Sequence, residues 1–99
     1  MAVESVYSED EERLTITVKG RFDFGQHAAF RDAYERHAPR QVVVDLKDAH
    51  YLDSSALGML LMLRDHVGEE SARISVVNVT DDVRKIFAIS NFDTLFDIS

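Results

Sequence analysis

Hydrophobic and polar residues alternate near the amino end of the chain. Leu14, Ile16 and Val18 are separated by polar residues, and this period of two predicts a half-buried strand over residues 13–19. A shorter strand around Val3 to Tyr7 is expected to pair with it as a hairpin. The acidic run between the two strands is interpreted as a solvated turn.

The pattern changes to helical spacing between Gln26 and His37. The positions that recur on one face of this predicted helix are Ala29, Phe30, Ala33, Tyr34 and His37. Pro39 ends the helix because its ring fixes φ and removes a backbone donor. Residues 41–46 follow with three consecutive valines, and this β-branched run predicts a central strand that is buried on both faces.

The second half of the chain repeats these signals. Ser54 occupies the position of an N-cap before a helix that we expect to reach about Val67. Residues 74–79 predict another strand, and a third helix opens at Thr80. The tail, residues 94–98, predicts a short final strand.

The predicted elements follow the order β-β-α-β-α-β-α-β. Strands that alternate with helices favour an α/β fold, in which a mixed, largely parallel β-sheet is packed by α-helices. The chain contains no internal repeat, linker or low-complexity stretch. Residues 1–99 are therefore expected to form a single domain.

Composition restricts the class of partner more than it restricts the fold. The chain is 45% hydrophobic and 29% charged, as in an ordinary globular domain, and it has no cysteine for a disulfide or a thiolate metal site. Its formal net charge of -7 disfavours nucleic acid and anionic membranes as partners. No secretory signal pattern and no apolar run of membrane-spanning length is present, so a cytoplasmic protein is expected.

Residues that could support catalysis or metal binding do not form a recognisable motif. The serines at 54 and 55 are not part of a Gly-x-Ser-x-Gly elbow, and no glycine loop for phosphate binding is present. We therefore predict a protein that is not an enzyme and that needs no cofactor or metal. Four histidines contain no pair at i,i+4 spacing, namely His27, His37, His50 and His66.

Asp45 supports an alternative. It ends a predicted buried strand, where response-regulator receivers carry their phosphorylated aspartate, and Thr80 after the later strand also fits that pattern. However, the chain lacks an acidic pair after its first strand and a later Lys-Pro element. It is also short by about one βα unit.

Ser54 and Ser55 stand at the start of the predicted second helix. Unpaired backbone N–H groups and the positive end of the helix dipole stabilise an added phosphate at such a position, so both serines are candidates for a phosphorylation switch. A serine N-cap without further function is the commoner arrangement. The spacing alone leaves both interpretations open.

The start of the same helix is unusually apolar. Residues 56–63 are apolar at every position except Gly58. A helix in a small domain rarely buries every side. Either the core covers this segment completely, or Leu57 or Met62 forms part of a surface that binds a partner.

The segment from Val42 to Gly58 reads Val-Val-Val-Asp-Leu-Lys-Asp-Ala-His-Tyr-Leu-Asp-Ser-Ser-Ala-Leu-Gly. It resembles the signature of STAS domains, in particular the bacterial anti-sigma factor antagonists, in which a buried strand and a loop lead into Asp-Ser-Ser-Gly-Leu-Gly and a helix. The stretch from Gly20 to Asp23 is similar to their Gly-x-hydrophobic-Asp element. Residues 74–87 are similar to their next strand and helix, so the resemblance covers essentially the whole chain.

The resemblance implies roles for individual residues. In that family the serine directly after the motif aspartate is phosphorylated by a partner kinase, which is itself the anti-sigma factor. This implies Ser54 as the acceptor and Ser55 as its neighbour, with Asp23 and Asp53 beside the acceptor and bordering the docking surface. The family's glycine after the two serines is Ala56 here, a better helix former that is expected to stiffen the first turn.

The resemblance thus implies a single STAS domain that acts as an anti-sigma factor antagonist. Unphosphorylated, it would sequester an anti-sigma factor or similar regulator, and phosphorylation on Ser54 would release that regulator. The expected partners are this regulator, acting as serine kinase, and a serine phosphatase. The alternatives are a receiver-like domain phosphorylated on Asp45, and a STAS scaffold or transport-accessory subunit outside sigma regulation. The residues assigned to partner binding are Asp23, Asp53, Ser55, Ala56, Leu57 and Met62.

Overall fold

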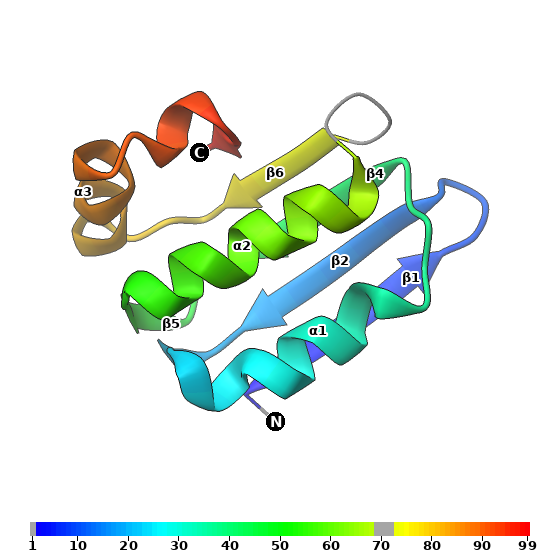
Figure 1. Ribbon diagram of the computed structural model, residues 1–99, viewed down its shortest axis with the longest axis horizontal. Helices are drawn as coiled ribbons and strands as arrows, with labels where there is room; N and C mark the ends of the chain where they lie inside the picture. Colours follow the sequence, from blue (N-terminus) through cyan, green and yellow to red (C-terminus); the bar gives the residue numbers. More distant parts are fainter. Residues whose placement is uncertain (1, 69–72) are drawn as a thin grey trace.

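The computed structural model describes residues 2–68 and 73–99 (Figure 1). The three predicted α-helices and the predicted hairpin are present, whereas two short strands, β3 and β5, were not predicted. In chain order the elements are β1 (Val3–Ser8), β2 (Arg13–Val18), β3 (Gly20–Phe22), the 3-10 helix η1 (Phe24–Gln26), α1 (His27–Glu35), β4 (Gln41–Asp45), β5 (Ala49–Leu52), α2 (Ser54–Val67), β6 (Arg73–Val77), α3 (Asp81–Ile89), the 3-10 helix η2 (Phe92–Thr94) and β7 (Asp97–Ile98).

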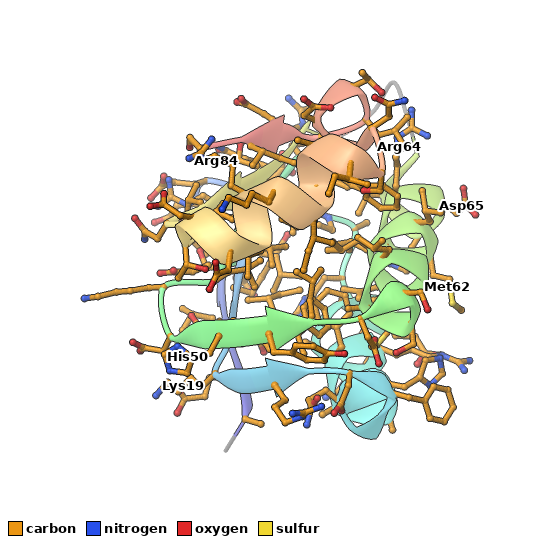
Figure 2. The ribbon with its side chains drawn as sticks, turned by 90° about the vertical axis from the view of Figure 1, so that its left-hand side faces the viewer. Lys19, His50, Met62, Arg64, Asp65 and Arg84 are labelled. Carbon is orange, nitrogen blue, oxygen red and sulfur yellow. The ribbon has the colours of Figure 1, made fainter. Side chains whose placement is uncertain are left out.

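The strands form one main sheet and one small sheet. The main sheet has the order β1-β2-β4-β6-β7, in which β1 is antiparallel to β2 and the other neighbours are parallel. This confirms the predicted mixed, largely parallel α/β sheet. The small sheet consists of β3 and β5, which pair in parallel (Figure 2).

Gly20 directs the chain out of the main sheet. Its φ of 77° is a left-handed conformation that glycine adopts without the strain of a Cβ atom. Its N–H donates to the Asp48 carbonyl at 2.8 Å, immediately before β5 begins. This turn therefore converts the end of β2 into the start of the separate β3–β5 pair.

Helices cover one face of the main sheet (Figure 1). The strand order runs in one direction from β2 to β4 to β6, and right-handed crossovers in such an order place their helices on the same side. On β4, Val42 and Val44 face these helices and are fully buried, whereas Val43 is only half-buried. The prediction that residues 41–46 are buried on both faces is therefore wrong.

The end of the chain also differs from its predicted form. Strand β6 stops at Val77, because Asn78 has a left-handed φ of 57° that an extended strand cannot accommodate. The predicted strand over residues 94–98 shortens to the two residues of β7. The aromatic side chains of Phe92 and Phe96 are buried and stack with ring centroids 5.8 Å apart, which favours a compact turn before β7.

The one-sided cover of the sheet predicts different costs for two adjacent valines. Val44→Ala is expected to lower the free energy of unfolding by about 2 kcal/mol, because it removes buried methyl groups and leaves a cavity. Val43→Ala is the matched control on the other face and is expected to cost less than about 1 kcal/mol. Urea unfolding measures both changes. Equal losses would contradict the one-sided arrangement.

Candidate functional site

The parallel pairing of β3 with β5 brings two aspartates together at the carboxyl ends of these strands. Phe22 lies opposite Leu52 at the ends of the two strands, and each strand is followed directly by an aspartate. The Asp53 N–H donates to the Phe22 carbonyl at 3.4 Å and extends the pairing by one residue. Asp23 and Asp53 therefore begin the two segments that leave this edge, η1 and α2.

Asp53 is the N-cap of α2. Its Oδ1 accepts a hydrogen bond from the Ala56 N–H at 3.1 Å and another from the Ser55 hydroxyl. The Ser55 hydrogen bond is the largest cause that holds the pKa of the Asp53 carboxyl below its ordinary value of 3.8; desolvation opposes it, and backbone N–H donors add to it. The structure thus assigns the cap to Asp53, whereas the sequence pattern had assigned it to Ser54.

Asp23 caps η1 in a similar way. Its Oδ1 accepts from the Gly25 N–H at 2.9 Å, and the Gln26 side chain accepts from the Asp23 N–H at 2.9 Å, which completes a capping box. The Arg21 Nε lies 3.4 Å from Asp23 Oδ2, and its guanidinium lies 4.4 Å from the centre of the Tyr51 ring. Asp23 is therefore held in place beside the start of α2.

Ser54 and Ser55 have different environments. Ser54 is the first residue of α2 and is exposed, and within the described parts of the chain its hydroxyl makes no hydrogen bond. The Ser55 hydroxyl is half-buried and donates to Asp53. The hydroxyl that is open to an enzyme from solution is therefore that of Ser54.

An apolar surface continues from Ser54 along α2. Leu57, Gly58 and Leu61 follow it at i+3, i+4 and i+7 and share its side of the helix. Leu57 is half-buried and Leu61 is 38% exposed. We call Ser54, Leu57, Gly58 and Leu61 the Ser54 face. Sequence reasoning did not single out Leu61, although its i+7 spacing from Ser54 could have identified it.

Two other predicted partner residues lie elsewhere. Ala56 is fully buried, so its side chain belongs to the core, and its assignment to the partner surface is wrong. Met62 is 46% exposed and projects from α2, but it lies in a groove between α1 and α2 together with Tyr34 and His66 (Figure 2). Met62 therefore borders the Ser54 face and is not part of it.

Phe24 is a candidate that the sequence analysis missed. It follows Asp23 directly, is 69% exposed, and stacks on His27 with ring centroids 5.2 Å apart. A large apolar residue between a capping aspartate and a glycine was the available signal. It adds an exposed aromatic ring at the edge where the two aspartates lie.

Asp45 lies apart from this site. Its register opposite Thr17 and Val77 places it on the face of the main sheet that points away from the described helices. Its Oδ1 accepts from the Lys47 N–H at 2.9 Å and from the Asn78 side-chain amide at 3.2 Å. The carboxylate is engaged in a turn, and the one-sided helix cover is not that of a doubly wound receiver.

Residues 2–68 and 73–99 contain neither a metal-binding cluster nor a membrane-spanning helix. No group of three or more His, Cys, Asp or Glu side chains is arranged to hold a metal ion there. In the same residues, no helix combines the length and the apolar character needed to cross a membrane.

Known proteins with similar sequences or structures agree with this arrangement. The model of the family described as "Mlab, STAS domain" matches residues 5–97. The STAS-domain containing protein PA14_20770 of Pseudomonas aeruginosa (strain UCBPP-PA14) is 62% identical over 101 residues, which cover 100% of both chains.

Two solved structures share the fold at low sequence identity. The anti-sigma factor antagonist SpoIIAA in its unphosphorylated form has a TM-score of 0.71 and 20% identity, over 89% of this chain and 83% of that one. An anti-sigma-factor antagonist (STAS) domain protein from Planctomyces limnophilus has a TM-score of 0.81 and 14% identity, over 97% of this chain and 87% of that one. The chain therefore belongs to the STAS domain family and has the SpoIIAA-like fold of anti-sigma factor antagonists.

Proposed function

We propose that this protein is an anti-sigma factor antagonist controlled by phosphorylation of Ser54. In the unphosphorylated state it binds an anti-sigma factor or similar regulator through the Ser54 face, and the phosphorylated state releases it. The observation that carries this proposal is the exposed Ser54 hydroxyl at the start of α2, between two ordered carboxylates and an apolar helix face.

Phosphorylation at this position has opposite effects on folding and on binding. The N-terminus of α2 presents backbone N–H groups and the positive end of the helix dipole, so it tolerates a phosphate dianion. In a complex, the same dianion would be desolvated near Asp23 and Asp53 against a surface shaped for a neutral hydroxyl. The modification can therefore break the complex while the domain stays folded.

The proposed role is binding and involves no catalysis by this chain. Asp53 accepts hydrogen bonds from Ser55 and Ala56 and acts as the helix cap. The catalytic base for phosphoryl transfer belongs to the kinase. The partners we propose are an anti-sigma factor that is also the serine kinase and a serine phosphatase, and the domain itself needs no cofactor.

A role outside sigma regulation is the alternative that an experiment must distinguish from the proposed function. The matching family model is described as "Mlab, STAS domain", and this description does not specify sigma regulation. A STAS scaffold or transport-accessory subunit is therefore the alternative. A receiver-like role for Asp45 has no support in the site, because its carboxylate is bonded within a turn on the uncovered sheet face.

Substitution of Ser54 tests the switch. The purified chain captures its partner from a lysate of the native cells, and the recombinant partner is then titrated by calorimetry with wild type, Ser54→Ala and Ser54→Asp. We expect Ser54→Ala to bind like wild type and Ser54→Asp to bind about a hundredfold more weakly, a loss of ~2.7 kcal/mol. Incubation with the partner and labelled ATP is expected to phosphorylate wild type and Ser55→Ala but not Ser54→Ala.

Three results would contradict the proposal. Equal affinity of all three proteins would remove the electrostatic switch, and phosphate mapped only to Ser55 would remove Ser54 as the acceptor. Capture of a transporter subunit without kinase activity would favour the transport-accessory role. The melting temperature of Ser54→Asp is the control, because the helix dipole predicts that its stability is unchanged or slightly raised.

Substitutions in the apolar part of the Ser54 face test whether this surface binds the partner. Leu61→Glu and Leu57→Glu are expected to weaken partner binding at least about tenfold, because a charge must be desolvated at the interface. Met62→Glu tests whether the surface extends to the α1 side of the helix. Ile89→Glu is the matched control, because Ile89 is 86% exposed on α3.

Stability measurements decide how these variants are interpreted. Leu57 is half-buried against the core, so its variant can lose binding through unfolding, whereas Leu61 is free of that ambiguity. If Leu61→Glu and Met62→Glu both stay folded and bind like Ile89→Glu, the docking surface lies elsewhere.

The Asp53–Ser55 hydrogen bond predicts a pH effect that is independent of any partner. A carboxyl whose pKa is lower in the folded state stabilises the fold above its ordinary pKa of 3.8, and this contribution is lost as the pH falls through the folded value. Ser55→Ala is expected to raise the Asp53 pKa toward 3.8, as measured by carbon-13 NMR of the carboxyl group. Asp53→Asn retains a good N-cap but removes the titration. An unchanged Asp53 pKa in Ser55→Ala would show that this hydrogen bond is not the cause.

A further inference from the structure

The outer side of β1 is unpaired within residues 2–68 and 73–99. In this part of the chain β1 is an edge strand whose single neighbour in the main sheet is β2. The Lys19 N–H donates to the Ala2 carbonyl at 2.8 Å, so Ala2 and Lys19 are a hydrogen-bonded pair. Such pairs alternate with non-hydrogen-bonded pairs along an antiparallel ladder, so every second residue of β1 after Ala2 bonds to β2. The backbone N–H and C=O groups of Val3, Ser5 and Tyr7 therefore point to the free edge.

β1 is longer than the other strands that lie at a sheet edge, and it has less protection against pairing with another chain. β7 has two residues, and β3 and β5 have three and four. Native proteins protect long edges with proline, lysine or a bulge. β1 has six residues, none of these protecting features, and a single charged side chain, that of Glu4.

A shallow groove of about 240 Å³ runs between this edge and α1. Ser5 lies on the helix-covered face of the sheet, because it is opposite the buried Ile16. The small side chains of Ala29 and Ala33 leave the space beside it open, so a side chain of an added strand could enter there. The residues that line the groove are Val3, Ser5, Ala29, Asp32, Ala33 and Arg36.

Charge indicates which kind of strand fits. The turn after β1 carries four consecutive carboxylates. Two of them pair with arginines at 2.9 Å and 2.7 Å, whereas Glu9 and Asp10 have no cation partner among the described residues. The net charge of -7 repels a second copy of the chain and attracts a basic segment.

We propose that β1 binds an extended, basic segment of a partner protein by strand addition. The segment would pair with the free backbone groups of Ser5 and Tyr7, place one small apolar side chain over Ala29 and Ala33, and bring a lysine or arginine to Glu9 and Asp10. This surface lies on the α1 side of the sheet, whereas Ser54 begins α2 at the end of the β3–β5 pair (Figure 1). It therefore does not depend on the phosphorylation proposal.

Backbone amides offer a direct test with the intact chain. The probe is an acetylated peptide of alternating valine and serine with two lysines at its amino end, and its counterpart carries two glutamates instead. In the free protein, the N–H groups of Ser5 and Tyr7 are expected to exchange with solvent faster than those of Glu4 and Val6, which bond to β2. The lysine peptide at millimolar concentration is expected to slow exchange at Ser5 and Tyr7.

Two variants at one position separate edge pairing from other contacts. Ser5→Pro removes an N–H that makes no bond to β2, and edge strands accept proline at such positions. It is expected to weaken peptide binding about tenfold, or ~1.4 kcal/mol. Ser5→Ala is the matched control, because it retains the N–H and is expected to bind like wild type. Ser54→Asp is also expected to bind the peptide like wild type.

Three outcomes would overturn the proposal. No protection of Ser5 and Tyr7 with the lysine peptide would exclude strand addition at β1. Equal binding of the glutamate peptide would exclude the basic partner. A dimer of the chain whose protected amides are Ser5 and Tyr7, and which Ser5→Pro dissociates, would make a second copy the occupant. If Ser5→Pro unfolds the domain, Ala29→Tyr is tested in place of Ser5→Pro. A tyrosine at this position fills the groove and is expected to weaken peptide binding.

Discussion

The handedness of the strand crossovers is the constraint on which the rest of this structure depends. Because β2, β4 and β6 follow one another in a single direction across the sheet, right-handed connections place α1 and α2 on the same face. One face therefore forms the core, and the other carries half-buried β-branched and polar side chains. The same topology leaves β1 at an edge, and no other described strand lies on its outer side.

The small β3–β5 sheet positions the residues of the candidate site. Its parallel strands end together, and the residue after each strand caps the segment that follows. Parallel pairing thus brings together two carboxylates that are thirty positions apart in the sequence. They stabilise helical starts through hydrogen bonds and impose negative charge beside Ser54, so the same groups support the fold and sensitise the proposed interface to a phosphate.

Residue types and periods predicted most of the fold. Alternation at Leu14, Ile16 and Val18 identified β2, helical spacing identified α1, and a cap position followed by an apolar run identified α2. The strand β3 was not predicted because three residues are too few to show a period, and its direction depends on the turn at Gly20. The valine run of β4 was misinterpreted because a period cannot show whether helices cover one face or two.

The sequence by itself determined the α/β class, the resemblance to STAS domains and the chemistry available near the start of α2. Only the tertiary structure decided how that chemistry is divided. It gave the cap to Asp53, tied the Ser55 hydroxyl to that carboxylate, buried Ala56, turned Met62 toward α1 and left Ser54 exposed beside Leu61. The physical reason is that local patterns specify which residues form a helix or a strand, whereas exposure and hydrogen-bond partners depend on which elements pack around them.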